Sequence, residues 1–186
     1  MVRMDDRAME VHKVLIAGPV GVGKTTAVRA ASDSPILTTD VQPTDDTRFE
    51  KDTTTVAMDF SVVWLDDHLK VHLYGTPGQE RFDFMWSVLS KGTASTILLA
   101  DHSNPDVLSD LEVYLDAFKP MIEKKRMVLG VTRIQSSDDH ALQYYRDIFT
   151  ERRMSVPVLE ADPRSRHDII VLIRASLAIT QIGHPV

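Results

Sequence analysis

The chain contains no cysteine among its 186 residues. This absence excludes disulfides, catalytic thiolates and metal sites with thiolate ligands, and it leaves the redox compartment open. Positive charge is also in short supply, because 21 Lys and Arg residues stand against 27 Asp and Glu residues. The longest basic run is residues 124–126. A groove for nucleic acid is therefore not indicated.

Long apolar segments are missing as well. The longest apolar runs, such as residues 169–173, are far shorter than the ~20 residues needed to span a bilayer. Residues 1–13 carry acids and lack the apolar stretch of a signal peptide. No glycine is placed for myristoylation, and no cysteine is available for prenylation. We therefore expect a cytoplasmic protein without a transmembrane segment.

The residues that are present fit one domain. The chain is 43% hydrophobic and 26% charged, which gives a chain of this length a full core and little spare sequence. We expect a single domain over residues 1–186, with a flexible N-terminus over residues 1–10.

Apolar, β-branched runs alternate along the chain with amphipathic segments. The predicted strands are 12–18, 55–65, 69–75, 95–100, 126–132 and 155–161, and the predicted helices are 24–32, 106–123, 138–152 and 165–182. Residues 34–52 are polar and contain two prolines, so they are predicted to form a long loop. Asp66 and Asp67 separate two strands and favour a hairpin. The implied fold class is α/β: a mixed six-stranded sheet with one antiparallel pair and helices on both faces.

The segment "GPVGVGKT", residues 18–25, matches the phosphate-loop pattern G-x-x-x-x-G-K-[ST] at every fixed position. It lies between a predicted strand and a predicted helix, where backbone N–H groups and the helix N-terminus can bind phosphate oxygens. Lys24 would neutralise the β- and γ-phosphates, and the Thr25 hydroxyl would hold Mg²⁺. A tight turn whose glycines serve only steric needs is the alternative. The residues predicted to bind nucleotide here are Gly18, Val20, Gly21, Val22, Gly23, Lys24, Thr25 and Thr26.

Three further stretches follow the phosphate loop in order: "TTTVAMDF", "LYGTPGQERFDFMW" and "GVTRIQ". Together with "AGPVGVGKTT" they resemble the Ras-like small GTPases. Within these, the chain is similar to the bacterial branch of gliding-motility polarity switches and GTPases of actinobacterial conservons. The resemblance runs from Val14 to about Ile182. It implies a P-loop NTPase sandwich with a six-stranded sheet, and small roadblock-type proteins as partners.

The resemblance implies roles for two switch segments. Thr55 matches the threonine of a T-x-x-x-D-F frame, so it would coordinate Mg²⁺ and sense the γ-phosphate. Thr53 and Thr54 are alternatives in the same register. The Gly78 N–H would contact the γ-phosphate, and Gln79 would orient the attacking water, which makes Gln79 and Lys24 the catalytic candidates.

Other side chains near these segments have less defined roles. Arg48 and Arg81 are candidates for stabilising the transition state, although a partner could supply that arginine instead. Met85, Trp86 and Leu89 form an apolar stripe that either packs in the core or belongs to a surface for partners.

The sequence departs from the small-GTPase pattern at two places. Gly75 replaces the aspartate of D-x-x-G, which normally supports a water on Mg²⁺, so metal binding should be weakened or re-routed. Gln135 replaces the aspartate of N-K-x-D, so one of its two contacts to guanine is weakened or lost. Thr132 and Arg133 fill the other positions of that motif, with the Arg133 stem over the base. The Ala161 N–H would donate to guanine O6.

These features lead to three hypotheses. The first is a regulatory GTPase that uses Mg²⁺, hydrolyses GTP to GDP slowly, and signals through residues 51–55 and 75–82 to roadblock-type and other partners. Such partners would also account for any peripheral association with a membrane. The second is a nucleotide-binding scaffold with little turnover or with relaxed selectivity between GTP and ATP. The third, an ATP-dependent phosphotransferase, lacks a lid-like segment rich in arginine.

Overall fold

One mixed sheet forms the centre of the protein in the computed structural model, which describes residues 8–38, 58–78 and 83–182. Its seven strands lie in the order β2-β3-β4-β1-β5-β6-β7. They are β1 (Glu10–Ala17), β2 (Leu37–Thr38), β3 (Asp59–Trp64), β4 (Leu69–Gly75), β5 (Ser95–Asp101), β6 (Met127–Thr132) and β7 (Val158–Glu160). The pairs β2–β3 and β3–β4 are antiparallel, and the other neighbouring strands are parallel.

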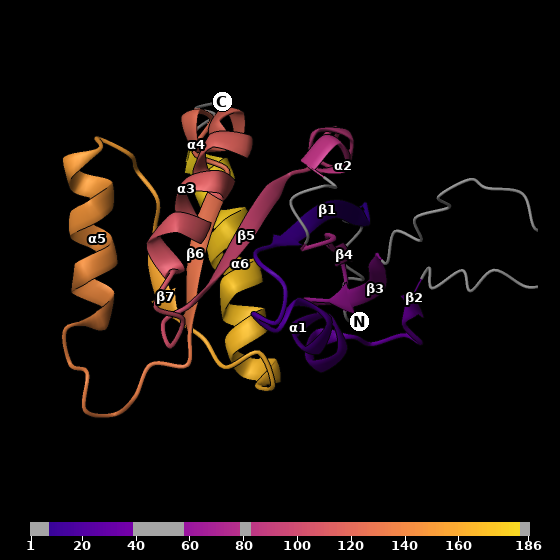
Figure 1. The fold of residues 1–186 in the computed structure, drawn as a ribbon. Helices are drawn as coiled ribbons and strands as arrows, with labels where there is room; N and C mark the ends of the chain where they lie inside the picture. Colours follow the sequence, from indigo (N-terminus) through magenta and orange to yellow (C-terminus); the bar gives the residue numbers. More distant parts are fainter. Residues whose placement is uncertain (1–7, 39–57, 79–82, 183–186) are drawn as a thin grey trace, which may run out of the picture.

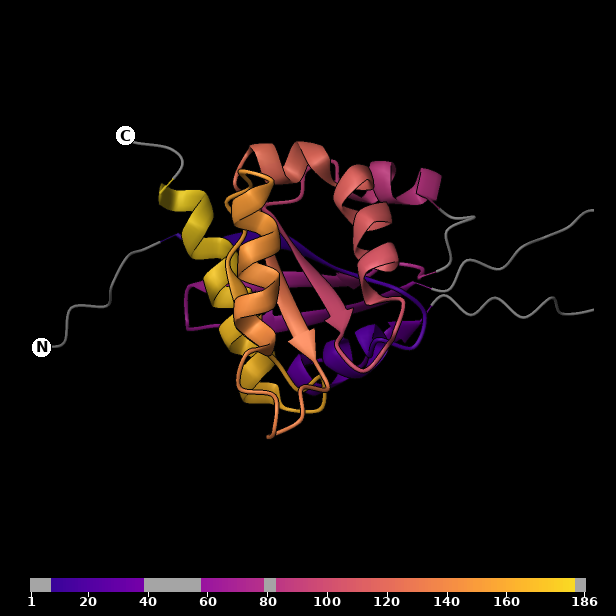
Figure 2. The same ribbon diagram turned by 60° about the vertical axis from the view of Figure 1, so that its left-hand side comes forward.

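Helices cover both faces of this sheet (Figure 1 and Figure 2). They are α1 (Lys24–Ala31), α2 (Asp83–Leu89), α3 (Val107–Ala117), α4 (Lys119–Glu123), α5 (Ala141–Glu151) and α6 (Arg166–Ile182). Within the described ranges, no helix is long and apolar enough to cross a membrane. Helices α1 and α6 pack on one face, and α2, α3, α4 and α5 pack on the other. The predicted α/β class with a three-layer arrangement is confirmed.

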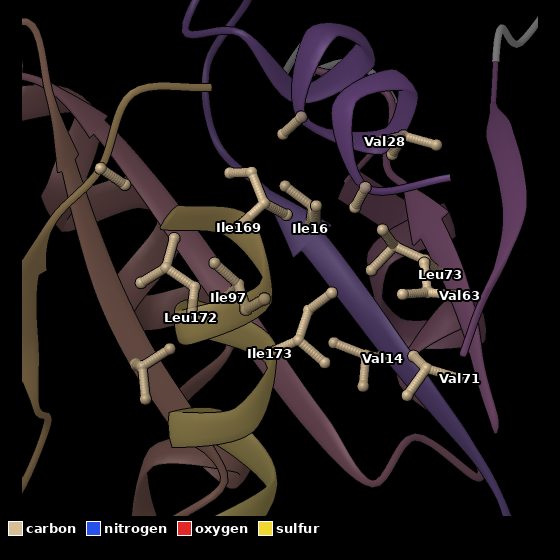
Figure 3. Packing of buried hydrophobic residues seen from close by; sticks show 14 of the residues in the cluster. Val14, Ile16, Val28, Val63, Val71, Leu73, Ile97, Ile169, Leu172 and Ile173 are labelled. Atoms are coloured by element: carbon tan, nitrogen blue, oxygen red, sulfur yellow. The ribbon is translucent and has the colours of Figure 1, made fainter. Parts of the chain in front are cut away.

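Strand β1 lies in the middle of the sheet and contributes to both halves of the core. Val14 and Ile16 point to the face covered by α1 and α6, whereas Leu15 and Ala17 point to the opposite face, because successive side chains of a strand alternate. Figure 3 shows Ile169 and its neighbours on α6 packed over the first of these faces. The carboxyl end of β1 is thereby held rigidly between two layers of helices.

The structure differs from the predicted elements in four places. The sheet has a seventh strand, because Leu37–Thr38, in the predicted loop, pairs with β3 as a short edge strand. The helix predicted over 106–123 is divided at Phe118 into α3 and α4, since Pro120 lacks the N–H that a continuous helix needs. Helix α2 was not predicted. Strand β1 begins at Glu10, inside the segment expected to be flexible, of which residues 1–7 lie outside the described ranges.

The hairpin of β3 and β4 has a fixed register. The Leu65 N–H donates to the Leu69 carbonyl at 2.9 Å, and the Asp66 carboxylate accepts from the backbone N–H of Leu69 at 2.8 Å. The turn between the strands therefore contains three residues. This register places Asp59 directly opposite Gly75.

Gly130 on β6 lies directly under α6. A Cβ at this position would be 2.9 Å from the Cδ1 atom of Leu172 and 2.9 Å from the Cδ2 atom of Leu99, both on buried side chains. We expect Gly130→Ala to lower the free energy of unfolding by about 1–2 kcal/mol through overpacking, and Leu172→Ala to lower it by about 2–5 kcal/mol. The double variant should lose less than the sum, because the smaller residue 172 makes room for the new methyl group. Urea unfolding measures all three, and additivity within about 0.5 kcal/mol would contradict this packing.

Candidate nucleotide-binding site

The predicted phosphate loop connects β1 to α1 at the carboxyl edge of the parallel strands. Gly18 has a φ of 142°, and a Cβ there would lie 2.6 Å from the carbonyl oxygen of Leu99. Gly23 has a φ of 108° and caps the N-terminus of α1. Side chains other than hydrogen are excluded at both positions. The eight predicted loop residues therefore lie together, as the motif requires.

Lys24 is partly buried against this loop. Its ammonium group donates to the carbonyl oxygens of Gly18 and Pro19, each at 2.7 Å. Burial lowers the pKa of Lys24 to about 8, and the nearby Asp59 carboxylate opposes this effect. An anionic phosphate beside the ammonium would favour its charged form.

Gly78 approaches the phosphate loop from the end of β4. A Cβ on Gly78 would lie 2.5 Å from Nζ of Lys24 and 2.8 Å from the backbone nitrogen of Val20. Only glycine leaves room for this contact. The predicted switch residues Thr55 and Gln79, the alternatives Thr53 and Thr54, and the candidate arginines Arg48 and Arg81 lie outside the described residues.

A buried carboxylate on β3 faces the start of α1. The Thr25 hydroxyl donates to Oδ2 of Asp59 at 2.5 Å, and the Thr38 hydroxyl donates to Oδ1 at 2.9 Å. A Cβ on Gly75 would touch the Asp59 side chain at 3.4 Å. Asp59 thus places a carboxylate beside the position where the D-x-x-G motif has one. Sequence reasoning missed this role, although an acid in an otherwise apolar strand was a signal for it.

The oxygen atoms of Thr25 and Asp59 suit Mg²⁺, which prefers hydroxyl, carboxylate and phosphate ligands. Within the described ranges, no group of three or more His, Cys, Asp and Glu side chains could hold a metal ion. The Thr25 hydroxyl and the Asp59 carboxylate offer two side-chain oxygen ligands. This pair fits an ion that shares its coordination with the phosphates of a nucleotide.

A cavity of about 550 Å³ lies beyond the phosphate loop. Five predicted site residues line it, namely Val22, Gly23, Thr26, Arg133 and Ala161. Arg133 has a φ of 58°, and its guanidinium donates to the Gly21 carbonyl at 2.8 Å and pairs with Asp101. Arg133 therefore joins the β6–α5 loop to the phosphate loop and to the end of β5. Asp101, at the end of β5, was not predicted as part of the site.

The β7–α6 loop does not present the N–H group predicted for guanine. The Ala161 N–H donates to the Val131 carbonyl, and the Asp162 N–H donates to Asp168, both at 2.9 Å. Pro163 has no N–H. The Ala161 prediction is therefore not met in this structure, because the residue that follows β7 donates its N–H to β6.

Two other predicted base-site residues lie away from this cavity. Thr132 is fully buried, and its hydroxyl donates to the Ala100 carbonyl at 3.2 Å. Gln135 lines a neighbouring cavity of about 610 Å³ on the side of α5. The acids Glu160 and Asp162 line the cavity of about 550 Å³ instead. The side chain and backbone of Arg164 lower the pKa of Asp162 to about 2, so Asp162 is a charged acceptor.

Comparison with known proteins gives this site a family. Residues 34–168, more than half of the chain, match the family described as "Conserved hypothetical ATP binding protein". The chain belongs to this family. The matched region begins after the phosphate loop, so the loop geometry and the family match are separate observations.

This family member is also similar to curated proteins of the Ras-related group. It is 25% identical over 170 residues to Ras-related protein Rab-18-B of Danio rerio, with 89% of this chain and 77% of the relative covered. It is 31% identical over 142 residues to Ras-related protein Rab-7b of Mus musculus, with 73% and 65% covered. With the fold, these similarities make it a nucleotide-binding, small GTPase-like protein.

A further relative has no described activity. The chain is 29% identical over 119 residues to an uncharacterized protein of Methanocaldococcus jannaschii, with 64% of this chain and 66% of the relative covered. The chain thus spans just under two thirds of the length of this relative and of Rab-7b.

We expect proton uptake on nucleotide binding to depend on pH through Lys24. With a pKa of about 8 in the free protein, about half of the Lys24 side chains are neutral at pH 8. A bound triphosphate favours the ammonium form, so binding at pH 8 should take up about half a proton, and binding at pH 6.5 almost none from this group. Titration calorimetry in buffers of different ionisation enthalpy measures this uptake. Lys24→Arg, whose side chain stays charged, is the control; equal uptake by both proteins at pH 8 would contradict the assignment.

Proposed function

We propose that this small GTPase-like protein is a regulatory switch that binds GTP with Mg²⁺ and hydrolyses it slowly. The observation that carries the proposal is the convergence of Lys24, Gly78 and the Thr25–Asp59 pair at the N-terminus of α1. A cation, a close backbone approach and hard oxygen ligands at one helix N-terminus support binding of the terminal phosphates of a triphosphate. A triphosphate with a bound metal ion uses the cation, the backbone approach and the oxygen ligands together.

Each group has a distinct task in this proposal. The loop N–H groups from Gly18 to Thr26 bind phosphate oxygens, and Lys24 neutralises the terminal phosphates. Thr25 and Asp59 hold Mg²⁺, which offsets the charge of the phosphates during transfer to water. Asp59 takes over the task of the carboxylate missing at Gly75. The water-orienting role of Gln79 and the sensing role of Thr55 rest on their motifs.

The switch would act on protein partners. Loss of the γ-phosphate removes the ligand of Gly78 and Thr55, so residues 51–55 and 75–82 change conformation between the two nucleotide states. The partner that we propose is a roadblock-type regulatory protein that accelerates hydrolysis, because the sequence motifs resemble those of gliding-motility and conservon GTPases. A cytoplasmic location, with any contact to membranes made through such partners, follows from the same proposal.

Base selectivity is the point at which a second candidate has support. Gln135 offers an amide in place of a carboxylate, and the Ala161 N–H is used within the sheet. Guanine O6 therefore lacks its usual backbone donor. Glu160 and Asp162 line the cavity and could accept a hydrogen bond from an N–H group of either base. The second candidate is a scaffold that binds GTP and ATP with similar affinity and turns over little of either. The description of the matched family also names ATP.

One experiment decides between these candidates. The purified protein is stripped of nucleotide, its affinities for GTP and ATP are measured with Mg²⁺, and phosphate release is followed with and without a roadblock-type partner. The switch predicts tighter binding of GTP and turnover that Gln79→Ala lowers by at least about tenfold. Binding without turnover even with the partner would reject the switch.

The carboxylate exchange between β3 and β4 can be tested directly. Asp59→Asn removes the charge that supports Mg²⁺. The factor by which Mg²⁺ slows nucleotide release should therefore be about 10–100-fold smaller in this variant than in the natural chain. Asp59→Asn combined with Gly75→Asp moves the carboxylate across the strand pair and should restore much of the Mg²⁺ effect. Release of a fluorescent nucleotide with and without Mg²⁺ provides the measurement. An unchanged Mg²⁺ effect in Asp59→Asn would remove Asp59 from the metal site.

A further inference from the structure

Two buried aromatic side chains hold the backbone at the end of β4. The indole N–H of Trp86, on α2, donates to the Pro77 carbonyl at 2.9 Å. The hydroxyl of Tyr114, on α3, donates to the Gly78 carbonyl at 3.2 Å. Both side chains are at most 2% exposed. Two successive carbonyls of the segment that approaches the phosphate loop are therefore fixed from the helical layer.

The first of these hydrogen bonds also sets the direction of an N–H group. The Pro77 carbonyl and the Gly78 N–H belong to one peptide unit, which is planar and trans. In such a unit the C=O and N–H bonds point in opposite directions. Because Trp86 holds the carbonyl, the Gly78 N–H points away from Trp86. A rotation of this peptide would leave the buried indole N–H without an acceptor, which is costly.

The contacts of Gly78 show what lies near this N–H. Gly78 packs against the phosphate loop, with its Cβ position 2.5 Å from Nζ of Lys24 and 2.8 Å from the nitrogen of Val20. The groups expected to bind the terminal phosphate are therefore immediate neighbours of the Gly78 residue. A small rotation of the peptide would change its fit to the γ-phosphate without changing the rest of the nucleotide site.

The aromatic side chains are themselves held in place. Trp86 stacks on Tyr114 with ring centroids 4.5 Å apart and an interplanar angle of 29°, and it lies 6.0 Å from the ring of Phe118. Stacked aromatic pairs in a core have little freedom to move. The two donors thus form a rigid support that belongs to α2 and α3 together.

We propose that Trp86 and Tyr114 are positioning residues that hold Pro77 and Gly78 so that the Gly78 N–H binds the γ-phosphate. This inference rests on the proposed nucleotide site and adds to it the residues that make the site distinguish a triphosphate from a diphosphate. The inference also gives a role to one residue of the predicted apolar stripe of Met85, Trp86 and Leu89. Trp86 is buried in the core and holds the Pro77 carbonyl, so its side chain is not available to a partner.

The test compares two nucleotide states in conservative variants of the full chain. Tyr114→Phe removes only the hydroxyl donor, whereas Trp86→Phe removes the indole N–H and also replaces the buried indole by a smaller aromatic ring. Each should weaken binding of a non-hydrolysable GTP analogue about five- to tenfold while GDP binding changes less than about twofold. Titration calorimetry with Mg²⁺ gives both affinities, and the corresponding ATP and ADP pair is measured in parallel.

The controls separate positioning from general stability. Trp64→Phe changes the other tryptophan, which is 42% exposed on β3 and far along the sheet from the phosphate loop, and should leave both affinities unchanged. Urea unfolding identifies any variant that does not fold. If Trp86→Phe does not fold, the inference is tested with Tyr114→Phe, which loses a single hydroxyl. An unchanged ratio of triphosphate to diphosphate affinity in a folded variant would overturn this inference but would leave the proposed function in place. Failure of the natural chain to bind either nucleotide would overturn the proposed function and this inference with it.

Discussion

The hydrogen bond from Thr25 to Asp59 ties the first turn of α1 to β3, and the geometry of the candidate site depends on it. It exists because the β3–β4 hairpin has a three-residue turn, which sets Asp59 opposite Gly75. The protein has its carboxylate on β3, and a Cβ at Gly75 on β4 would be in van der Waals contact with the Asp59 side chain.

The two ends of the nucleotide site have departed from the small-GTPase pattern to different degrees. At the phosphate end, the glycine conformations, the lysine and a carboxylate are all present. The carboxylate lies on β3, at Asp59, whereas the small-GTPase motif has it at the position of Gly75 on β4. At the base end, the neutral Gln135 lies in a separate cavity, and the Ala161 N–H is used by the sheet. Phosphate binding uses backbone groups and a few charges, whereas base selection needs individual donors and acceptors in exact places. The second requirement is lost more easily.

The segment that follows β4 lies between two rigid supports. On one side Gly78 touches the phosphate loop, and on the other Trp86 and Tyr114 hold its carbonyls. Pro77 and Gly78 therefore link the phosphate loop to the core beneath α2 and α3, so a movement at the loop can be passed to the core through these two residues. Packed cores move between discrete arrangements more readily than they deform, which suits a switch with two states.

Local patterns along the chain were enough to predict the phosphate loop, most of the strands and helices, and the departures at Gly75 and Gln135, because glycine spacing and apolar periodicity are short-range properties. The tertiary structure alone decided that Asp59 faces Thr25, that the Ala161 N–H donates to Val131, and that Trp86 reaches Pro77. A turn one residue shorter would have shifted the register and turned Asp59 away from its place opposite Gly75. The register of strands and the direction of individual N–H groups depend on contacts between distant segments, so no local pattern could reveal them.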